Sequence, residues 1–310
     1  MFARVTAIAL NAYREAVRAR LLYALLALAL AACGYSVIVA SLSLDQQARV
    51  VSDVGSGSIS LFAVIVAIIL GAWSLYREIE LKTIFPVLAR PLFRHEYLLG
   101  KYLGILLTLL VFIAIDGAAV LGILALETGA RPASVLAATG ALVVGLGALL
   151  LRFPRARVHA VVPWSLAAFA TMAVLAAPAG GDRQLVVASC ALTLGEVAII
   201  SAVATLFSSF SSPFLTAVFT VSVFLIGRSA DTLAHLPARQ VGTTVKHAAA
   251  ALAHVVPNLQ VYVPARPILL GEVPEMPTWH LVAKAAAQSC AYSVVMLCAA
   301  ALIFRRRDFS

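Results

Sequence analysis

Residues 103–126 read LGILLTLLVFIAIDGAAVLGILAL, an apolar run in which Asp116 is the single charged side chain. A helix of about 20 mostly apolar residues, rising 1.5 Å per residue, crosses the roughly 30 Å hydrocarbon core of a bilayer. The run is rich in Leu and Ala and lacks the alternation of a half-buried strand. It therefore predicts a transmembrane helix.

The rest of the chain has the same character. Of its 310 residues 62% are hydrophobic and 12% are charged, and the mean hydropathy is +0.99. A soluble domain carries about 25% charged residues, so this chain has too few to cover a surface that faces water. Only helices and closed barrels satisfy their backbone in lipid, and the Ala- and Leu-rich runs favour helices. We predict an all-α, polytopic membrane helix bundle formed by one domain over residues 1–310.

Eight transmembrane helices fit the hydropathy pattern. Polar residues with Gly and Ser at 41–57 predict a loop, and six prolines punctuate a long external region at 230–279. The stretch 134–178 forms either two spans or a partly re-entrant hairpin, and the basic cluster at its tip favours a true crossing. The predicted spans are 21–40, 58–75, 103–126, 134–151, 160–178, 185–207, 213–229 and 280–304.

Residues 1–20 predict an interfacial helix. Arginines gather on one face, and Val5, Ile8 and small residues gather on another, as in basic helices that lie on a membrane. The following run ends at Cys33 in a pattern that imitates a bacterial lipoprotein signal, but an ordinary first span fits better because the run starts late. The four cysteines lie in apolar runs without CxxC spacing, so neither disulfides nor a zinc site is expected.

The distribution of basic residues predicts the orientation. With the N-terminus inside, the inner segments hold fifteen Lys and Arg and the outer segments hold seven. Cytoplasmic loops of membrane proteins carry an excess of Lys and Arg, so both termini are expected in the cytoplasm. The formal charge of +9 then reflects topology and anionic lipid headgroups. No basic patch interleaved with aromatic residues is present, so nucleic-acid binding is not expected.

Segment 76–102 (YREIELKTIFPVLARPLFRHEYLLGKY) is the most informative cytoplasmic stretch. It mixes charged with apolar residues, and Pro86 and Pro91 divide it into two short amphipathic pieces. Such a surface suits docking of another protein, and a helix that rests on headgroups is the alternative. Gly100-Lys101 is followed by Tyr102, where a P-loop needs Ser or Thr. The chain is therefore not expected to hydrolyse ATP or to be an enzyme.

Several motifs resemble permeases of type-two ABC exporters, closest to the group linked with multi-copper enzyme maturation and gliding machinery. They are 78–84 (EIELKTI), 90–102 (RPLFRHEYLLGKY), 11–18 (NAYREAVR), 206–213 (LFSSFSSP) and 257–262 (PNLQVY). The resemblance covers most of the chain. Because that family usually has six spans, residues 132–183 are expected to be an inserted pair.

The resemblance implies a mechanism in the bacterial inner membrane. Two permease copies, or this chain and a related one, would form a dimer above cytoplasmic ABC ATPase subunits. ATP and Mg²⁺ would be bound by the ATPase, and no cofactor by this chain. The residues expected to couple the permease to the ATPase are Glu78, Glu80, Thr83, Pro91, Arg94, Glu96, Gly100, Lys101, Ser209 and Phe210.

Two carboxylates interrupt apolar runs, Asp116 in the third predicted span and Glu196 in the sixth. Ionised groups are costly in lipid, so these residues belong either to a substrate or proton path or to polar contacts that lock the helices. His235, His247 and His254 of the external region lack a recognised ligand spacing, so no metal is expected. A gradient-driven transporter and a membrane scaffold that recruits a partner remain the alternative functions.

Overall fold

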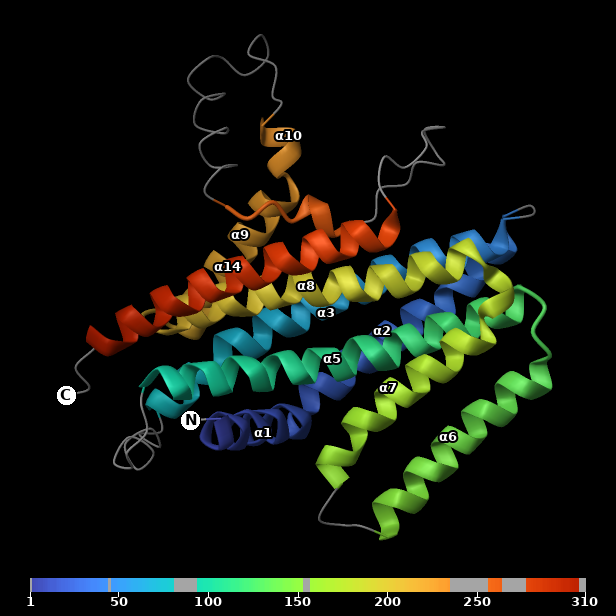
Figure 1. Cartoon of the computed structure of the whole chain (residues 1–310), viewed down its shortest axis with the longest axis horizontal. Helices are drawn as coiled ribbons and strands as arrows, with labels where there is room; N and C mark the ends of the chain where they lie inside the picture. The colour runs from blue at the N-terminus through green and yellow to red at the C-terminus, as the bar shows by residue number, and fades with distance from the viewer. Residues whose placement is uncertain are drawn as a thin grey trace. The chain divides into compact units, whose positions relative to one another are not determined.

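The computed structural model describes residues 2–43, 46–80, 94–152, 157–234, 256–263 and 277–306. Every regular element in these ranges is a helix, as predicted (Figure 1). The helices are α1 (Phe2–Arg18), α2 (Arg20–Ser41), α3 (Gln47–Glu80), α5 (Arg94–Glu127), α6 (Pro132–Arg152), α7 (Arg157–Leu175), η2 (Ala177–Ala179), α8 (Gly181–Ser208), α9 (Pro213–Arg228), α10 (Ala230–Ala234), η3 (Gln260–Tyr262) and α14 (Thr278–Arg306).

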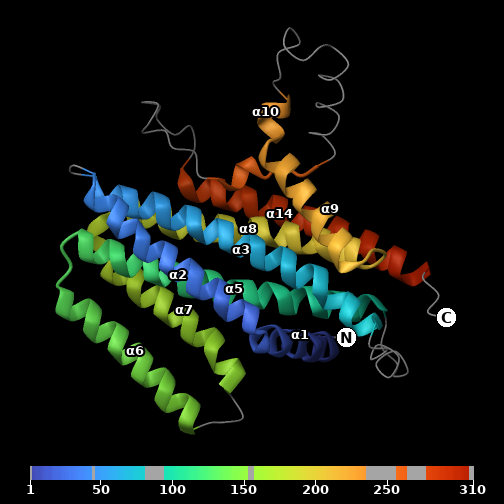
Figure 2. The same ribbon diagram turned by 180° about the vertical axis from the view of Figure 1, so that it is seen from behind.

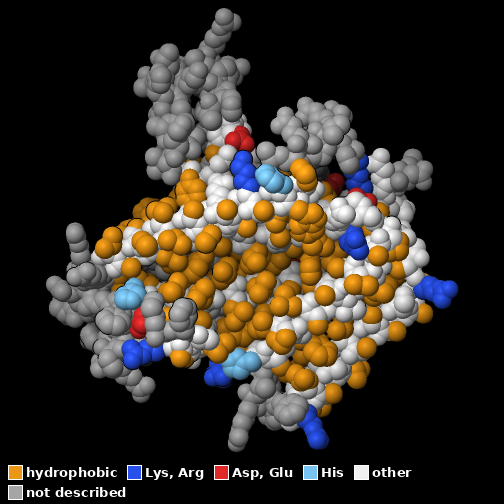
Figure 3. Space-filling view, viewed as in Figure 1, with side chains coloured by type: hydrophobic (Ala, Val, Ile, Leu, Met, Phe, Trp, Pro, Cys, Tyr) orange, Lys and Arg blue, Asp and Glu red, His pale blue; other side chains and the backbone are white. Residues whose placement is uncertain are grey.

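Seven described helices are long and apolar enough to cross a membrane: α2, α3, α5, α6, α7, α8 and α14. Their surfaces agree with that environment. Large apolar side chains such as Leu136 and Val174 are exposed, and hydrophobic side chains cover much of the face seen in Figure 3. Many serines and threonines and the carboxylates of Asp116 and Glu196 are buried instead. A surface this apolar around a partly polar interior fits lipid, so the chain is a multi-pass membrane protein.

Helix α9 is the exception among the predicted spans. It has 16 residues and is therefore about 24 Å long, shorter than the roughly 30 Å of hydrocarbon. Thr216, Thr220 and Gly227 are buried on one side, and Phe214 is exposed on another. The predicted count of eight full spans is thus not confirmed, because the seventh is a short apolar helix.

The predicted loop at 41–57 is wrong over most of its length, because α3 begins at Gln47. Gly55 explains why a Gly/Ser-rich stretch is helical here. A Cβ atom at Gly55 would lie 2.6 Å from Cγ1 of Val120 on α5. Small residues let membrane helices approach closely, so these residues serve helix packing and do not form a turn.

The predicted cytoplasmic segment 76–102 is helical at both of its ends. Helix α3 continues through Glu80, and α5 begins at Arg94, so both ends of the segment extend long helices. Residues 81–93, which contain Thr83 and Pro91, lie outside the described residues.

The chain divides into two compact units. Unit 1 comprises Met1–Ala9, Ala67–Leu103 and Gly195–Ser310, and unit 2 comprises Leu10–Val66 and Gly104–Leu194. Helices α1, α3, α5 and α8 contribute residues to both units.

In unit 2 the predicted inserted pair consists of two complete helices. Helices α6 and α7 lie side by side in Figures 1 and 2, and the indole Nε1–H of Trp164 donates to the carbonyl of Leu142 at 3.0 Å. Gly145 makes room for the same indole ring, because a Cβ atom at this position would lie 2.8 Å from a ring carbon of Trp164. Near the hairpin tip, Arg14 donates to Nε2 of His159 at 2.5 Å. Two helices of 21 and 19 residues favour the hairpin over a re-entrant loop.

Helix α1 is amphipathic, as predicted, and its small apolar face is buried within the protein. The buried residues are Val5, Ala9, Ala12, Tyr13 and Ala16, and the exposed ones include Arg4, Asn11, Arg14, Glu15 and Arg18. The exposed basic face remains available to headgroups. The buried face shows that α1 also belongs to the packed fold.

Candidate functional site

The best-defined polar site lies in unit 1 around Glu196. This residue is fully buried in α8, fifteen residues after Gly181 and twelve before Ser208. At 1.5 Å per residue, its carboxylate is about 22 Å from one end of the helix and about 18 Å from the other. Glu196 therefore lies near the middle of a helix long enough to span a bilayer.

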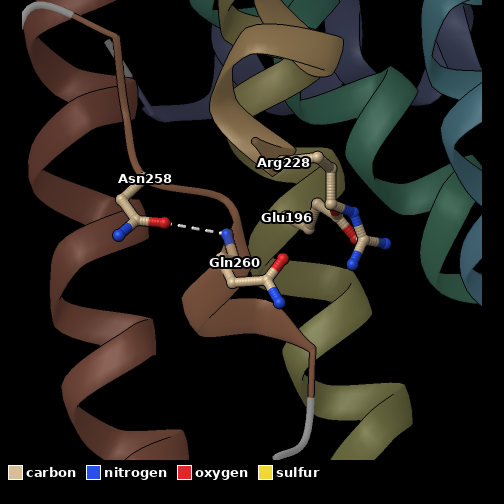
Figure 4. A network of polar contacts seen from close by, with 4 residues as sticks. All are labelled: Glu196, Arg228, Asn258 and Gln260. Carbon is tan, nitrogen blue, oxygen red and sulfur yellow. Dashed lines mark hydrogen bonds and ion pairs between the residues drawn. The ribbon is translucent and has the colours of Figure 1, made fainter. Parts of the chain in front are cut away.

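Arg228 at the end of α9 pairs with Glu196. Its Nε lies 3.0 Å from Oε1, and Nη2 donates to Oε2 at 3.3 Å. Figure 4 shows the two side chains beside segment 256–263. The guanidinium carbon also lies 5.7 Å from the centroid of the Phe224 ring, within the range of a cation–π interaction. Because α9 ends here, its last turn lies level with the middle of α8.

Segment 256–263 reaches the same place without forming an α-helix. The N–H of Leu259 donates to the carbonyl of Gly227 at 3.0 Å. Asn258 donates to Oδ1 of Asp231 at 2.7 Å and accepts from the N–H of Gln260 at 2.9 Å, the bond drawn in Figure 4. The segment is thus fastened to the end of α9 and to α10.

Two glycines form the floor beneath this segment. A Cβ atom at Gly195 of α8 would lie 2.8 Å from the Tyr262 ring. One at Gly227 of α9 would lie 2.7 Å from the carbonyl oxygen of Pro257 and 2.8 Å from Cγ of Leu259. Leu259 and Tyr262 are consequently buried. Their fit requires that neither helix position carry a side chain.

Tyr262 connects the segment to α14. Its phenol donates to the carbonyl of Ala285 at 3.0 Å. Ser289 of α14 is a second hydrogen-bond partner of the phenol.

Non-helical backbone next to the middle of a membrane helix must lie inside protein or line water. Here the N–H groups of Leu259, Gln260, Tyr262 and Val263 all have acceptors. Segment 256–263 is thus a compact, hydrogen-bonded insertion among α8, α9 and α14.

The second predicted carboxylate, Asp116, lies in unit 2 in a different setting. The Cys33 thiol donates to its Oδ1 at 3.0 Å, and the thiol lies 3.7 Å from the Ser58 hydroxyl. Its buried Oδ2 has no hydrogen-bond partner among the residues that the structure describes. Among the described residues, the side chain that hydrogen-bonds Asp116 is thus a neutral thiol, whereas Glu196 pairs with a guanidinium.

The predicted coupling residues divide into buried and exposed groups. In α5, Glu96, Gly100 and Lys101 are buried, and a Cβ atom at Gly100 would lie 2.6 Å from Cβ of Ile8. After α8, Ser209 is buried and donates to the carbonyl of Leu206, whereas Phe210 is 47% exposed. Gly100 thus has a packing role against α1, and Phe210 is accessible.

The two stretches that contain the described coupling residues, 94–102 and 206–213, meet at one end of unit 1. Tyr97 and Leu98 of α5 form a buried cluster with Ala300 and Phe304 of α14, and Leu206 packs against it. Ile8 of α1 joins the same cluster. Residues more than a hundred positions apart in the sequence therefore form one end of this unit.

Part of the prediction falls outside the described residues. Glu78, Glu80 and Arg94 lie in helices whose side chains are not described at those positions, and His235, His247 and His254 lie in ranges not described. Among the residues that the structure describes, no group of three His, Cys, Asp or Glu side chains is arranged to hold a metal ion.

Sequence reasoning did not identify Arg228 as a site residue, although it lies at the end of the predicted span 213–229. A signal was available, because a carboxylate inside an apolar run usually pairs with a basic residue of another run. Arg228 directly follows the apolar stretch of α9, the next such run after Glu196.

No known family model and no curated protein matches the chain in sequence.

Proposed function

We propose that this chain is the permease subunit of an ABC exporter in a bacterial inner membrane, driven by a separate cytoplasmic ATPase that binds ATP and Mg²⁺. In this proposal, ATP hydrolysis by the partner subunit supplies the energy, and the substrate moves out of the cytoplasm. It also includes a second permease copy, or a related permease, as a partner.

The observation that carries the proposal is the cluster at one end of unit 1. Stretches 94–102 and 206–213 both resemble the cytoplasmic segments of type-two permeases, and Leu206 of one packs on Tyr97 and Leu98 of the other. An ATPase that docked at this end would contact both stretches together. Phe210 offers an exposed aromatic anchor there, the residue type that dominates binding energy at interfaces.

From this end, α8 leads directly to the ion pair. Glu196 lies twelve residues before Ser208 on one continuous helix, and Phe207 packs on Phe219 of α9 with ring centroids 5.3 Å apart. A push on the end of α8 would therefore move Glu196 and the α9 contact as a body. Rigid helices of this kind transmit domain motions in known switching proteins.

The test is co-purification with an ABC ATPase that is encoded beside this chain and has no spans of its own. We expect the complex to form with the wild type and to lose at least about tenfold in affinity in Phe210→Ala, because aromatic anchors contribute 2 kcal/mol or more. Trp279→Ala is the control, since Trp279 is an exposed aromatic residue at the start of α14, at the opposite end of that helix from Phe304. Equal retention of the ATPase by both variants would refute docking at this end.

One observation favours a gradient-driven transporter as the second candidate. Asp116 is buried, and within the described ranges its Oδ2 has no hydrogen-bond partner, as for a carboxyl that takes up and releases a proton. Asp116→Asn separates the two functions. An ATP-driven permease would keep its transport when this residue is neutral, whereas a proton-coupled carrier would lose it.

A further inference from the structure

We propose that segment 256–263 is a removable plug, which seals a path beside the Glu196–Arg228 pair and leaves its seat when that path opens toward the end at which α14 begins. The seat is formed by Gly195 of α8, Gly227 of α9, and Ala285 and Ser289 of α14. The proposal rests on the proposed function in one respect, since a path to be sealed presupposes a permease.

The helices around the seat are held together by contacts that do not involve the segment. The Phe207–Phe219 contact and the Glu196–Arg228 ion pair join α8 to α9. Leu206 packs on the cluster that contains Phe304, which joins α8 to α14. Withdrawal of 256–263 would therefore leave the walls of the seat in place.

The segment is held by contacts that can be broken one at a time. Hydrogen bonds between described residues connect Leu259 to Gly227, Tyr262 to Ala285, and Asn258 to Asp231. An ordinary hydrogen bond contributes a modest net free energy, so a few of them allow a local opening equilibrium. The remaining hold is the burial of the Leu259 and Tyr262 side chains over two glycines.

The chemistry of the empty seat explains why it would open to water and not to lipid. Withdrawal would uncover the Glu196–Arg228 pair, the carbonyl of Ala285 and the hydroxyl of Ser289. Unsatisfied polar groups are costly in hydrocarbon, whereas water satisfies them. The site thus has two stable arrangements, one dry with the segment seated and one hydrated with the segment withdrawn.

A buried reporter beneath the plug measures this opening. Ser289 is 7% exposed and bonds with Tyr262, so Ser289→Cys places a thiol under the segment. The background carries Cys33→Ser, which keeps a donor for Asp116, and alanine at Cys190, Cys290 and Cys298. Whole cells are treated with a membrane-impermeant maleimide. His280→Cys, at an exposed position on α14, gives the rate for an accessible thiol.

Labelling of Ser289→Cys should be much slower than that of His280→Cys. In this background the Ser289 hydroxyl is already replaced, so Tyr262→Phe removes the hydrogen bond to Ala285 without changing the packing and should raise the labelling rate about fivefold. Asn258→Ala removes the bond to Asp231 and the turn bond to Gln260, and should raise it by about fivefold to twentyfold. Gln260→Ala is the matched control, because its side chain is exposed and only its backbone is used.

Two results would overturn the proposal. If Tyr262→Phe and Asn258→Ala both label within twofold of Gln260→Ala, the segment is a permanent brace. If Ser289→Cys labels as fast as His280→Cys in every variant, the segment does not cover the seat. The measurement needs no ATPase, so its failure would leave the docking proposal standing, and failed co-purification would leave the labelling result intact.

Discussion

Replacing Arg228 by Gln should destabilise the protein more than replacing Glu196 by Gln. The reason is an asymmetry in burial: the Glu196 side chain is fully buried, whereas that of Arg228 is 25% exposed. Without Arg228, a carboxylate is left inside the protein with its principal cation gone. Without the charge of Glu196, the guanidinium can turn toward its exposed side.

The size of the effect follows from the geometry. Two unit charges about 4 Å apart attract by about 4 kcal/mol at an effective dielectric constant of about 20. Removal of one partner of a buried pair costs about 3–5 kcal/mol, so we expect a loss in this range for Arg228→Gln. For Glu196→Gln we expect about half of that loss, and the double variant should be more stable than Arg228→Gln alone.

The assay is the free energy of unfolding in detergent micelles, measured by titration with a denaturing detergent for both single variants and the double variant. This cycle isolates the coupling between the two side chains. Asp182→Asn, on the same helix, is the control and should change stability by less than about 0.5 kcal/mol. If Arg228→Gln costs no more than this control, the ion pair does not hold α9 to α8.

Three further changes test the packing. Gly227→Ala should destabilise by about 1–3 kcal/mol in the same titration, because its Cβ would lie 2.7 Å from a backbone oxygen, and no loss would contradict the tight seat. Gly140→Ala is the counterpart in open space and should be neutral or stabilise by up to about 1 kcal/mol. Gly100→Ala should loosen the packing of α1 and speed limited proteolysis of α1 even without an ATPase, because the new Cβ would lie 2.6 Å from Cβ of Ile8. Unchanged proteolysis would contradict the packing role of Gly100 and leave only the role in docking.

The hydropathy of the sequence predicted the helices because membrane thickness fixes a minimum length of apolar residues. It failed where turn rules from soluble proteins were applied. Gly55 and its serine neighbours lie inside α3, since small residues in lipid serve close helix contacts. The predicted count of eight spans is not confirmed, because the 16 residues of α9 fall just below the usual range for a span.

The candidate site was predictable only in part. Glu196 was identified because a carboxylate in an apolar run is costly. Its contacts with Arg228 and the seating of Tyr262 over Gly195 depend on how α9 ends and on which loop residues return to α8. Sequence periodicity contains no information on these contacts, since they join residues up to 67 positions apart, as Gly195 and Tyr262 are.

Orientation in the membrane is the claim on which ATPase docking and the plug both depend. The direct measurement is labelling of single cysteines at Thr6, Phe210 and His280 in intact and permeabilised cells with an impermeant maleimide. All three positions are exposed and belong to unit 1. We predict that Thr6→Cys and Phe210→Cys react only after permeabilisation, whereas His280→Cys reacts in intact cells. Labelling of Phe210→Cys in intact cells would contradict the account.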